Sequence, residues 1–303
     1  MIRLCDLKIS YRIGSRVINA VDGVTLTIPD GSIVGIAGES GCGKSTLMKA
    51  IYGDIQAPMH LSGGTIEYGL KGADGRPVTP ATIRREWFKS ISYVPQSSMN
   101  SLNPVIRIRD QFIDFPGTDS NKKRVLERAR DYIGRLGLPP EALDSYPHQL
   151  SGGMRQRVMI GLATFFQPEL IIADEPTTAL DVVVQKEILM LLMDLQEQMG
   201  NTILVVSHDM GVHYQVTHKM LIMYAGRVVE FGDTESVFAD PQHAYTRMLI
   251  DSLPTIGDDS MRGAVASAAG AGGDRAYRVE AELIEVKPGH FVARPAARDG
   301  APA

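Results

Sequence analysis

The chain has 303 residues, of which 44% are hydrophobic and 22% are charged. These proportions fit a soluble globular protein and exclude a mainly disordered or fibrous chain, while the length allows one large domain or two modest ones. Lys and Arg number 31 against 35 Asp and Glu, so the net charge is −4, which disfavours a strongly basic nucleic-acid-binding protein.

The sequence also excludes several kinds of membrane segment and cysteine site. No uninterrupted apolar run reaches the ~20 residues that a membrane-spanning helix needs. Charges at Arg3, Asp6 and Lys8 interrupt the first residues and exclude a signal-peptide core there. We therefore expect a cytosolic protein, or one on the cytosolic face of a membrane. The two cysteines, Cys5 and Cys42, make neither a disulfide framework nor a metal cluster.

Short strands are predicted at the start of the chain. Residues 24–28 alternate apolar and polar side chains and a Pro-Asp-Gly turn follows them, so residues 1–35 favour a short antiparallel sheet. The pattern then changes, because residues 33–37 are all small or apolar and predict a buried strand. Residues 45–52 predict the helix that comes after this strand.

The middle of the chain combines further buried strands with helices. Residues 170–173 and 202–206 predict strands of a parallel sheet that helices cover on both faces. Between the first strand and these two, residues 97–166 predict a mostly helical insertion. Residues 122–136 support it with apolar side chains at helical spacing. Residues 224–230 predict a hairpin.

The composition changes after Pro254. Residues 255–275 are rich in Ala and Gly, which is typical of a flexible linker. Residues 277–292 alternate again and predict a short strand pair around Pro288 and Gly289.

A Gly-rich loop lies between the predicted strand at 33–37 and its helix. Its sequence, GESGCGKS, is a P-loop, whose backbone N–H groups turn inward toward phosphates while the helix N-terminus adds positive potential. Lys44 would reach the β- and γ-phosphates, and the Ser45 hydroxyl would ligate Mg²⁺. The residues expected to contact the nucleotide here are Gly38, Glu39, Ser40, Gly41, Cys42, Gly43, Lys44, Ser45 and Thr46.

Two carboxylates end the predicted strand at 170–173. Asp174 is placed to hold Mg²⁺, directly or through water, and Glu175 to orient and polarise an attacking water. An acid pair at a strand end is common and often only faces solvent. With a P-loop roughly 130 residues earlier, the pair indicates nucleotide hydrolysis.

Residues 150–156 have the sequence LSGGMRQ, which resembles the signature sequence of ATP-binding cassette (ABC) ATPases. Ser151 and the amides of Gly152 and Gly153 begin a predicted helix and would form a second anion site. The resemblance implies that this segment, with Gln156, caps the γ-phosphate of ATP held by the P-loop of a partner subunit. The working unit would then be a head-to-tail dimer.

The same resemblance implies roles for four further positions. Tyr11 resembles the aromatic residue that stacks on adenine, although an ordinary strand tyrosine is the alternative. Gln96 resembles the glutamine that touches Mg²⁺ and the water and couples to the membrane partner. Residues 179–181, ending in Asp181, resemble the loop that crosses the dimer interface, and His208 resembles the switch histidine at the γ-phosphate.

Within that family the chain resembles the oligopeptide/dipeptide importer subfamily. The stretches that carry this resemblance are 96–105, 146–150, 174–182 and 243–249, the last with Ala244 where the subfamily usually has Pro. Some similar members move nickel or oligosaccharides. Many members have a Cys-rich C-terminal segment, in some cases suited to an iron–sulfur cluster. This chain has no cysteine after Cys42, so we expect no such cluster.

The resemblance covers residues 1–254 and implies an α/β fold of the P-loop NTPase class. Its ABC-type nucleotide-binding domain would have an antiparallel β subdomain, a parallel-sheet core and a helical subdomain at about 97–166. Residues 255–303 are predicted to be a C-terminal extension with a flexible Ala/Gly linker. The implied catalytic residues are Glu175, His208, Gln96 and Lys44, and the implied metal ligands are Ser45, Gln96 and Asp174.

The implied activity is ATP hydrolysis with ATP and Mg²⁺, which powers an importer of peptides or a related solute from the cytoplasmic face of the plasma membrane. The implied partners are a second ABC ATPase subunit, identical or different, two transmembrane permease subunits and, indirectly, an extracytoplasmic substrate-binding protein, with no nucleic acid. The alternative is an accessory ABC ATPase of a soluble metabolic enzyme complex, similar to phosphonate-breakdown subunits.

Overall fold

The computed structural model describes residues 1–72, 74–96, 101–115, 121–178, 180–253 and 279–295. Two compact units divide the chain. The helical unit comprises Met1, Pro29–Ile33 and Tyr68–Val206, and the strand-rich unit comprises Ile2–Ile28, Val34–Glu67 and Ser207–Ala303. In these described ranges no helix has the length and apolarity to span a bilayer. The predicted limits at 97 and 254–255 and the Ala/Gly linker lie outside the described residues.

Three parallel strands run through the helical unit. They are β5 (Ile91–Val94), β6 (Leu170–Asp174) and β7 (Thr202–Val206), with β6 between the other two. Every residue of β6 and β7 is buried, and a strand covered on both faces needs apolar side chains on both. The two apolar runs therefore predicted these strands correctly. β5 has only four residues and was not predicted.

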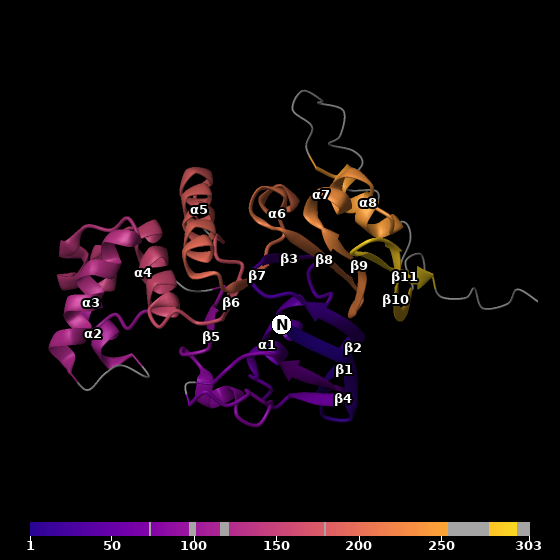
Figure 1. The fold of residues 1–303 in the computed structure, drawn as a ribbon, viewed down its shortest axis with the longest axis horizontal. Helices are drawn as coiled ribbons and strands as arrows, with labels where there is room; N and C mark the ends of the chain where they lie inside the picture. The colour runs from indigo at the N-terminus through magenta and orange to yellow at the C-terminus, as the bar shows by residue number, and fades with distance from the viewer. Residues whose placement is uncertain (73, 97–100, 116–120, 179, 254–278, 296–303) are drawn as a thin grey trace, which may run out of the picture. The chain divides into compact units, whose positions relative to one another are not determined.

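Helices make up much of the remainder of this unit. They are η1 (Ile83–Glu86), α2 (Ile108–Asp114), α3 (Lys122–Arg135), η3 (Pro140–Asp144), η4 (Pro147–Gln149), α4 (Gly152–Thr164) and α5 (Val182–Met199). Figure 1 shows α2, α3 and α4 grouped together, and their core includes Phe112, Ile133 and Phe165. In α3 the buried residues Val125, Ala129, Tyr132 and Ile133 fall on one helical face.

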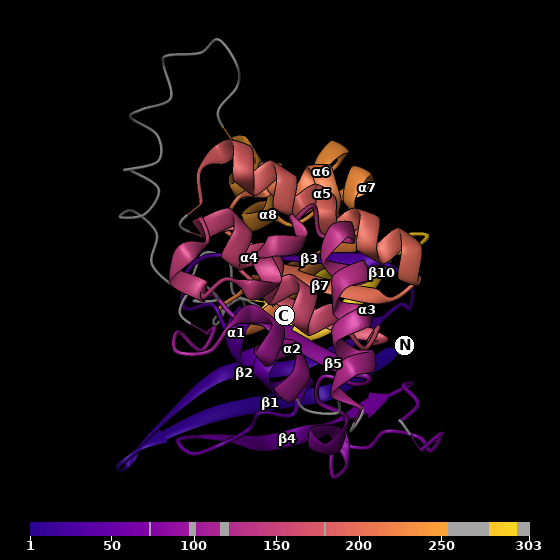
Figure 2. The same ribbon diagram turned by 90° about the vertical axis from the view of Figure 1, so that its left-hand side faces the viewer.

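The strand-rich unit begins with a three-stranded antiparallel sheet. Its strands are β1 (Ile2–Ile13), β2 (Arg16–Ile28) and β4 (Met59–Tyr68), in the order β2-β1-β4 that Figure 2 shows. The register joins Ile2 to Ile28 and Tyr11 to Ile18. The alternating pattern predicted β1 and β2. β4 was not predicted, because its residues are mostly small or polar.

A second sheet of this unit carries the P-loop at the end of one strand. Its strands are β3 (Ile33–Ala37), β8 (Lys219–Tyr224), β9 (Arg227–Asp233), β10 (Val279–Lys287) and β11 (His290–Pro295). β3 is parallel to β8, while β8, β9, β11 and β10 pair antiparallel in that order. Both predicted hairpins are confirmed, and the C-terminal one extends the sheet beyond β9.

Four helices complete the strand-rich unit: α1 (Lys44–Tyr52), α6 (Met210–Val216), α7 (Thr234–Ala239) and α8 (Ala244–Asp251). α7 and α8 pack beside β9, as Figure 1 shows, around a core that includes Ile222, Val229 and Tyr245. α1 begins directly after the Gly-rich loop, as predicted. The loop is thus held between the end of a buried strand and the start of a helix.

Candidate functional site

The Gly-rich loop closes tightly against its own unit. Gly43 is the N-cap of α1 with φ 108°, and a Cβ placed there would lie 2.2 Å from the carbonyl oxygen of Ala20. Glu39, Ser40 and Gly41 are exposed at the outer turn. Only glycine fits at Gly43, because the backbone is left-handed and a neighbouring strand lies against it.

The Gly43→Ala variant is expected to be destabilised by about 1–3 kcal/mol beyond the cost of a left-handed alanine, because its methyl group would collide with backbone rather than with a flexible side chain. The matched control is Gly14→Ala, which has φ 60° but no atom within 4 Å of the new methyl group. Urea unfolding of both variants measures the difference. Equal losses of stability would show that the loop can yield at this position.

Lys44 lies across the inside of the loop. Its side chain is only 8% exposed, and Nζ donates to the carbonyl oxygens of Gly38 at 2.7 Å and Glu39 at 2.8 Å. A buried ammonium is favourable only when such acceptors surround it. The loop therefore concentrates positive charge beside a set of backbone amides, which is the chemistry that phosphate needs.

The other residues predicted to contact the nucleotide here differ in their exposure and in their contacts. Ser45 is exposed at the first turn of α1. The hydroxyl of Tyr11 lies 3.2 Å from Oγ1 of Thr46, so β1 brings the tyrosine to the same helix turn. Cys42 is 6% exposed, and burial raises the pKa of its thiol against the opposing charge of Lys44. Its side chain fills space in the loop as a neutral thiol.

His208 follows β7 in the chain and is exposed just ahead of α6. The next residue, Asp209, caps that helix, because its Oδ1 accepts from the backbone N–H of Gly211 at 2.8 Å and of Val212 at 3.3 Å. A second histidine, His213, is fully buried in α6, with Nε2 lying 3.1 Å from the carbonyl oxygen of Ser207. Burial lowers the pKa of His213 to about 4, so this imidazole is neutral at neutral pH.

His213 should make the stability of the protein depend on pH. Between its unfolded pKa near ~6.5 and its folded pKa of about 4, the unfolded chain binds a proton that the folded chain does not. The free energy of unfolding is then highest above pH ~6.5 and falls by ~2 kcal/mol at pH 5 through this residue.

The test compares wild type with His213→Gln, which keeps an N–H donor but does not titrate. Urea unfolding near pH 7.5 and pH 5 should show a smaller loss of stability in the variant. The same loss in both proteins would contradict a buried neutral imidazole.

In the helical unit, Asp174 ends β6 and is 5% exposed. Its Oδ2 accepts a hydrogen bond from the hydroxyl of Tyr93 at 2.6 Å, from the neighbouring strand β5. The bond fixes the direction of the carboxylate. Tyr93 was not singled out from the sequence, because one tyrosine in a short strand has no distinguishing pattern.

Glu175 is half-buried and turns sharply out of β6, with φ 48°. Its backbone N–H donates to the carbonyl oxygen of Val206 at 3.0 Å. Oε2 accepts from Nε2 of Gln96 at 2.7 Å and from Oγ1 of Thr178 at 2.9 Å. The structure thus brings together Gln96 and Glu175, which lie 79 residues apart in the chain. Thr178 is a second partner that the sequence did not identify.

The Ser-Gly-Gly segment begins α4, as predicted. Ser151 is its N-cap and accepts from the backbone N–H of Met154 at 3.3 Å. A Cβ at Gly153 would lie 2.7 Å from Cγ1 of Val184, so the starts of α4 and α5 touch. Asp181 caps α5 by accepting from Val184 N–H at 3.0 Å. Gly152 lies in the first turn, Gln156 is 2% exposed, and Ala179 lies outside the described residues.

The predicted magnesium ligands offer the oxygen atoms that Mg²⁺ prefers: a hydroxyl, an amide and a carboxylate. Tyr93 fixes one oxygen of Asp174, and a fixed carboxylate fits that role. In the part of the chain that the structure describes, no group of three or more His, Cys, Asp or Glu could hold a metal ion by itself.

Comparison with known proteins gives two matched regions. The profile of the ABC transporter family matches residues 21–178. The profile of the oligopeptide/dipeptide transporter C-terminal region matches residues 229–273, which include most of β9 and all of α7 and α8.

Individual proteins resemble most of the chain. The dipeptide transport ATP-binding protein DppD of Escherichia coli is 39% identical over 261 residues, covering 84% of this chain and 79% of that protein. The oligopeptide transport ATP-binding protein AmiE of Streptococcus pneumoniae is 36% identical over 262 residues, covering 84% and 72%. A dimeric ATP-binding cassette solved in a post-hydrolysis state with ADP and Pi matches 77% of this chain and 99% of its own, with a TM-score of 0.65 and 27% identity.

Proposed function

Because this chain belongs to the ABC transporter family, among the relatives of oligopeptide and dipeptide transport ATP-binding proteins, we propose that it is the ATP-hydrolysing subunit of a peptide importer. The observation that carries the proposal is the match of residues 229–273 to the oligopeptide/dipeptide transporter C-terminal region. The description of that region links the chain to oligopeptide and dipeptide transporters, which the P-loop alone does not do.

In this proposal the strand-rich unit binds the phosphates. Backbone amides within the loop Gly38–Thr46 donate to phosphate oxygens, and the ammonium of Lys44 neutralises the β- and γ-phosphates. Tyr11 stacks on adenine, and His208 contacts the γ-phosphate. The two carbonyl contacts of Lys44 support its role in phosphate binding, because they hold the ammonium at the loop, where phosphate oxygens can replace the carbonyl oxygens as acceptors.

The residues of the helical unit supply water activation and contacts to a partner. Glu175 polarises the attacking water, and Gln96 orients that water through its contact with the same carboxylate. Ser151, Gly152 and Gly153, with Gln156 of the same segment, cap the γ-phosphate on a second ATPase subunit. Asp181 belongs to the loop that crosses the interface with that subunit. A bound Mg²⁺, held by Ser45, Asp174 and Gln96, would neutralise charge that develops on the phosphates.

The assembly that we propose contains two ATPase subunits, identical or different, on two transmembrane permease subunits at the cytoplasmic face of the plasma membrane. An extracytoplasmic binding protein delivers the solute. We assign residues 1–254 to the ATPase domain, with a helical subdomain at about 97–166, and residues 255–303 to a C-terminal extension.

Capture of partners tests the transport assignment. Tagged Glu175→Gln protein is purified with Mg·ATP from detergent-solubilised cells, and the proteins that accompany it are identified by mass spectrometry. Two multi-span membrane proteins are expected, and tagged Lys44→Ala protein shows which partners need bound nucleotide. Recovery of soluble metabolic enzymes instead would overturn the transport assignment in favour of an accessory ATPase.

Uptake by whole cells tests the solute. A strain that lacks this chain is complemented with wild type or with Glu175→Gln, and the uptake of labelled dipeptide, labelled tetrapeptide, Ni²⁺ and a labelled oligosaccharide is compared. Only peptide uptake should depend on the wild-type protein. Dependence of nickel or oligosaccharide uptake instead would overturn the peptide assignment and leave the ATPase assignment standing.

A further inference from the structure

The sequence stretch 243–249 has no part in the mechanism above, yet its first residues lie in the interior of the strand-rich unit. His243 is the N-cap of α8, and its Nδ1 accepts from the backbone N–H of Tyr245 at 3.2 Å. Burial lowers the pKa of His243, which favours the neutral imidazole, and a neutral ring has one nitrogen that can accept. Tyr245 is fully buried and packs against Tyr224, with ring centroids 4.6 Å apart.

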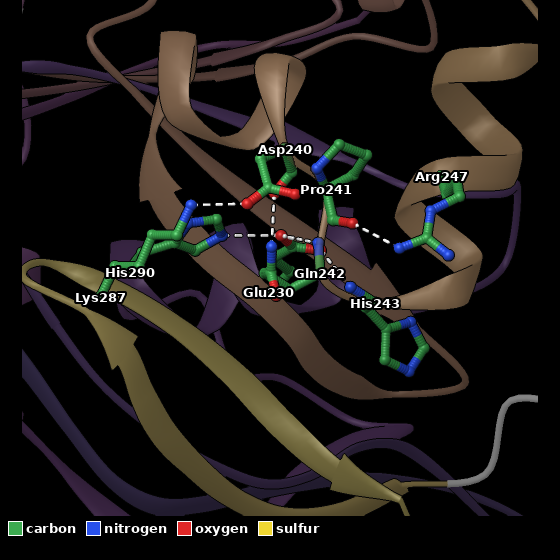
Figure 3. Close-up of polar contacts among 8 residues, drawn as sticks. All are labelled: Glu230, Asp240, Pro241, Gln242, His243, Arg247, Lys287 and His290. Atoms are coloured by element: carbon green, nitrogen blue, oxygen red, sulfur yellow. Dashed lines mark hydrogen bonds and ion pairs between the residues drawn. The ribbon is translucent and has the colours of Figure 1, made fainter.

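A buried carboxylate holds the start of α8 in place. Glu230 of β9 is fully buried, and its two oxygens accept from the backbone N–H groups of Gln242 and His243, each at 2.9 Å. Figure 3 shows that the carboxylate also faces His290 of the C-terminal hairpin, whose Nε2 lies 2.7 Å from Oε1. One carboxylate therefore joins β9, α8 and the hairpin.

A second contact ties the same segments together nearer the surface. Lys287, at the end of β10, donates to Oδ2 of Asp240 at 2.5 Å, just before the segment that Glu230 holds (Figure 3). This ion pair is exposed and contributes little by itself. The Glu230–His290 contact is buried on both sides, so its loss would leave a buried carboxyl oxygen with one hydrogen bond fewer.

The same end of α8 also contacts the P-loop, through Tyr245. The hydroxyl of Tyr245 accepts from the backbone N–H of Glu39 at 2.8 Å. That N–H belongs to the same peptide group as the carbonyl of Gly38, which accepts from Nζ of Lys44 at 2.7 Å. A peptide group is planar, so the tyrosine that fixes its N–H also fixes the direction of its carbonyl. Tyr245 thereby fixes the direction of the Gly38 carbonyl, one of the two carbonyl groups that accept from Lys44.

We propose that Tyr245 is a positioning residue of the P-loop, and that the C-terminal hairpin holds Tyr245 in place through Glu230, so that the docked hairpin raises the affinity for ATP. The inference rests on the proposed ATPase function and deepens it, since it assigns the 243–249 stretch and residues 279–295 to the control of nucleotide binding.

The first test is Tyr245→Phe, which removes only the hydroxyl. Its KM for ATP should rise about tenfold, the effect of losing ~1.4 kcal/mol of binding free energy, while kcat changes less than about twofold. The matched control is Tyr132→Phe, because Tyr132 is also buried and its hydroxyl also makes one hydrogen bond, to Thr164 at 2.6 Å, within the helical unit. The control should lose similar thermal stability without a change in KM.

The second test addresses the hairpin in the full-length chain. His290→Ala should raise the KM for ATP about threefold, and His290→Gln, which restores an N–H donor, should return it toward the wild-type value. In the Tyr245→Phe/His290→Ala double variant the KM should equal that of Tyr245→Phe alone, because both changes act through one contact.

The outcomes separate the inference from the function on which it rests. Equal KM values for the Tyr245→Phe and Tyr132→Phe proteins, with wild type active, would overturn the inference alone. A wild-type KM in His290→Ala, or a double variant whose KM is the product of the two single effects, would overturn the role of the hairpin. Wild-type protein that neither binds nor hydrolyses ATP would overturn both the inference and the proposed function.

Discussion

Glu175→Gln protein is expected to bind ATP with nearly wild-type affinity and to hydrolyse it about 10²- to 10⁴-fold more slowly, the usual contribution of a general base. The amide has nearly the shape of the carboxylate and can accept from Gln96 and Thr178 through its oxygen, so the local fold should persist. It cannot take the developing proton of the water. ATP should then remain bound, and the subunits should stay associated in the presence of Mg·ATP.

Phosphate release under single-turnover conditions and light scattering with and without Mg·ATP measure these two effects. The matched control is Thr178→Val, which removes the hydrogen bond from Thr178 to Glu175 and leaves the carboxylate. It should lower kcat far less than Glu175→Gln does. Hydrolysis at the wild-type rate by the Glu175→Gln protein would require a different base.

Lys44→Ala protein is expected to bind ATP at least ~100-fold more weakly than wild type. The change removes the buried ammonium and leaves the carbonyl oxygens of Gly38 and Glu39 facing the place where phosphate would bind. A charge-assisted contact to phosphate is lost, and repulsion from the carbonyl oxygens replaces it.

The control for this second prediction lies on the same helix. Lys49→Ala makes the same change in net charge at an exposed position of α1. Titration with a fluorescent ATP analogue should show nearly wild-type affinity for Lys49→Ala and a large loss for Lys44→Ala. If both variants bound ATP equally well, Lys44 would not contact the phosphates.

The parts of the fold that sequence could predict are those with a uniform environment. β6 and β7 are buried along their whole length, so each appears as an apolar run, and α3 has one buried face that appears at helical spacing. β4 and β5 lack such a pattern. β4 pairs with β1 through a segment of small and polar residues, and β5 is too short for any periodicity to show.

The residues of the site also divide into those that the local sequence predicts and those that it does not. The P-loop, the acid pair and the Ser-Gly-Gly segment are local in sequence, because a loop that wraps a phosphate or caps a helix takes its atoms from consecutive residues. Tyr93, Thr178 and Tyr245 act through single side-chain contacts. For Tyr93 and Tyr245 nothing in the neighbouring residues determines which distant group the side chain will meet, so only the folded chain reveals these contacts.

The late position of β10 and β11 in the sequence has a consequence for biosynthesis. Phe291 and Val292 pair with Phe231 and Glu230 of β9, so β9 is an open edge until the last part of the chain has left the ribosome. An open edge with an apolar residue and a carboxylate without its histidine is prone to pair with another nascent chain. A premature stop codon shortly after α8 would therefore harm the yield of soluble protein, because it removes the strand that covers the edge of β9.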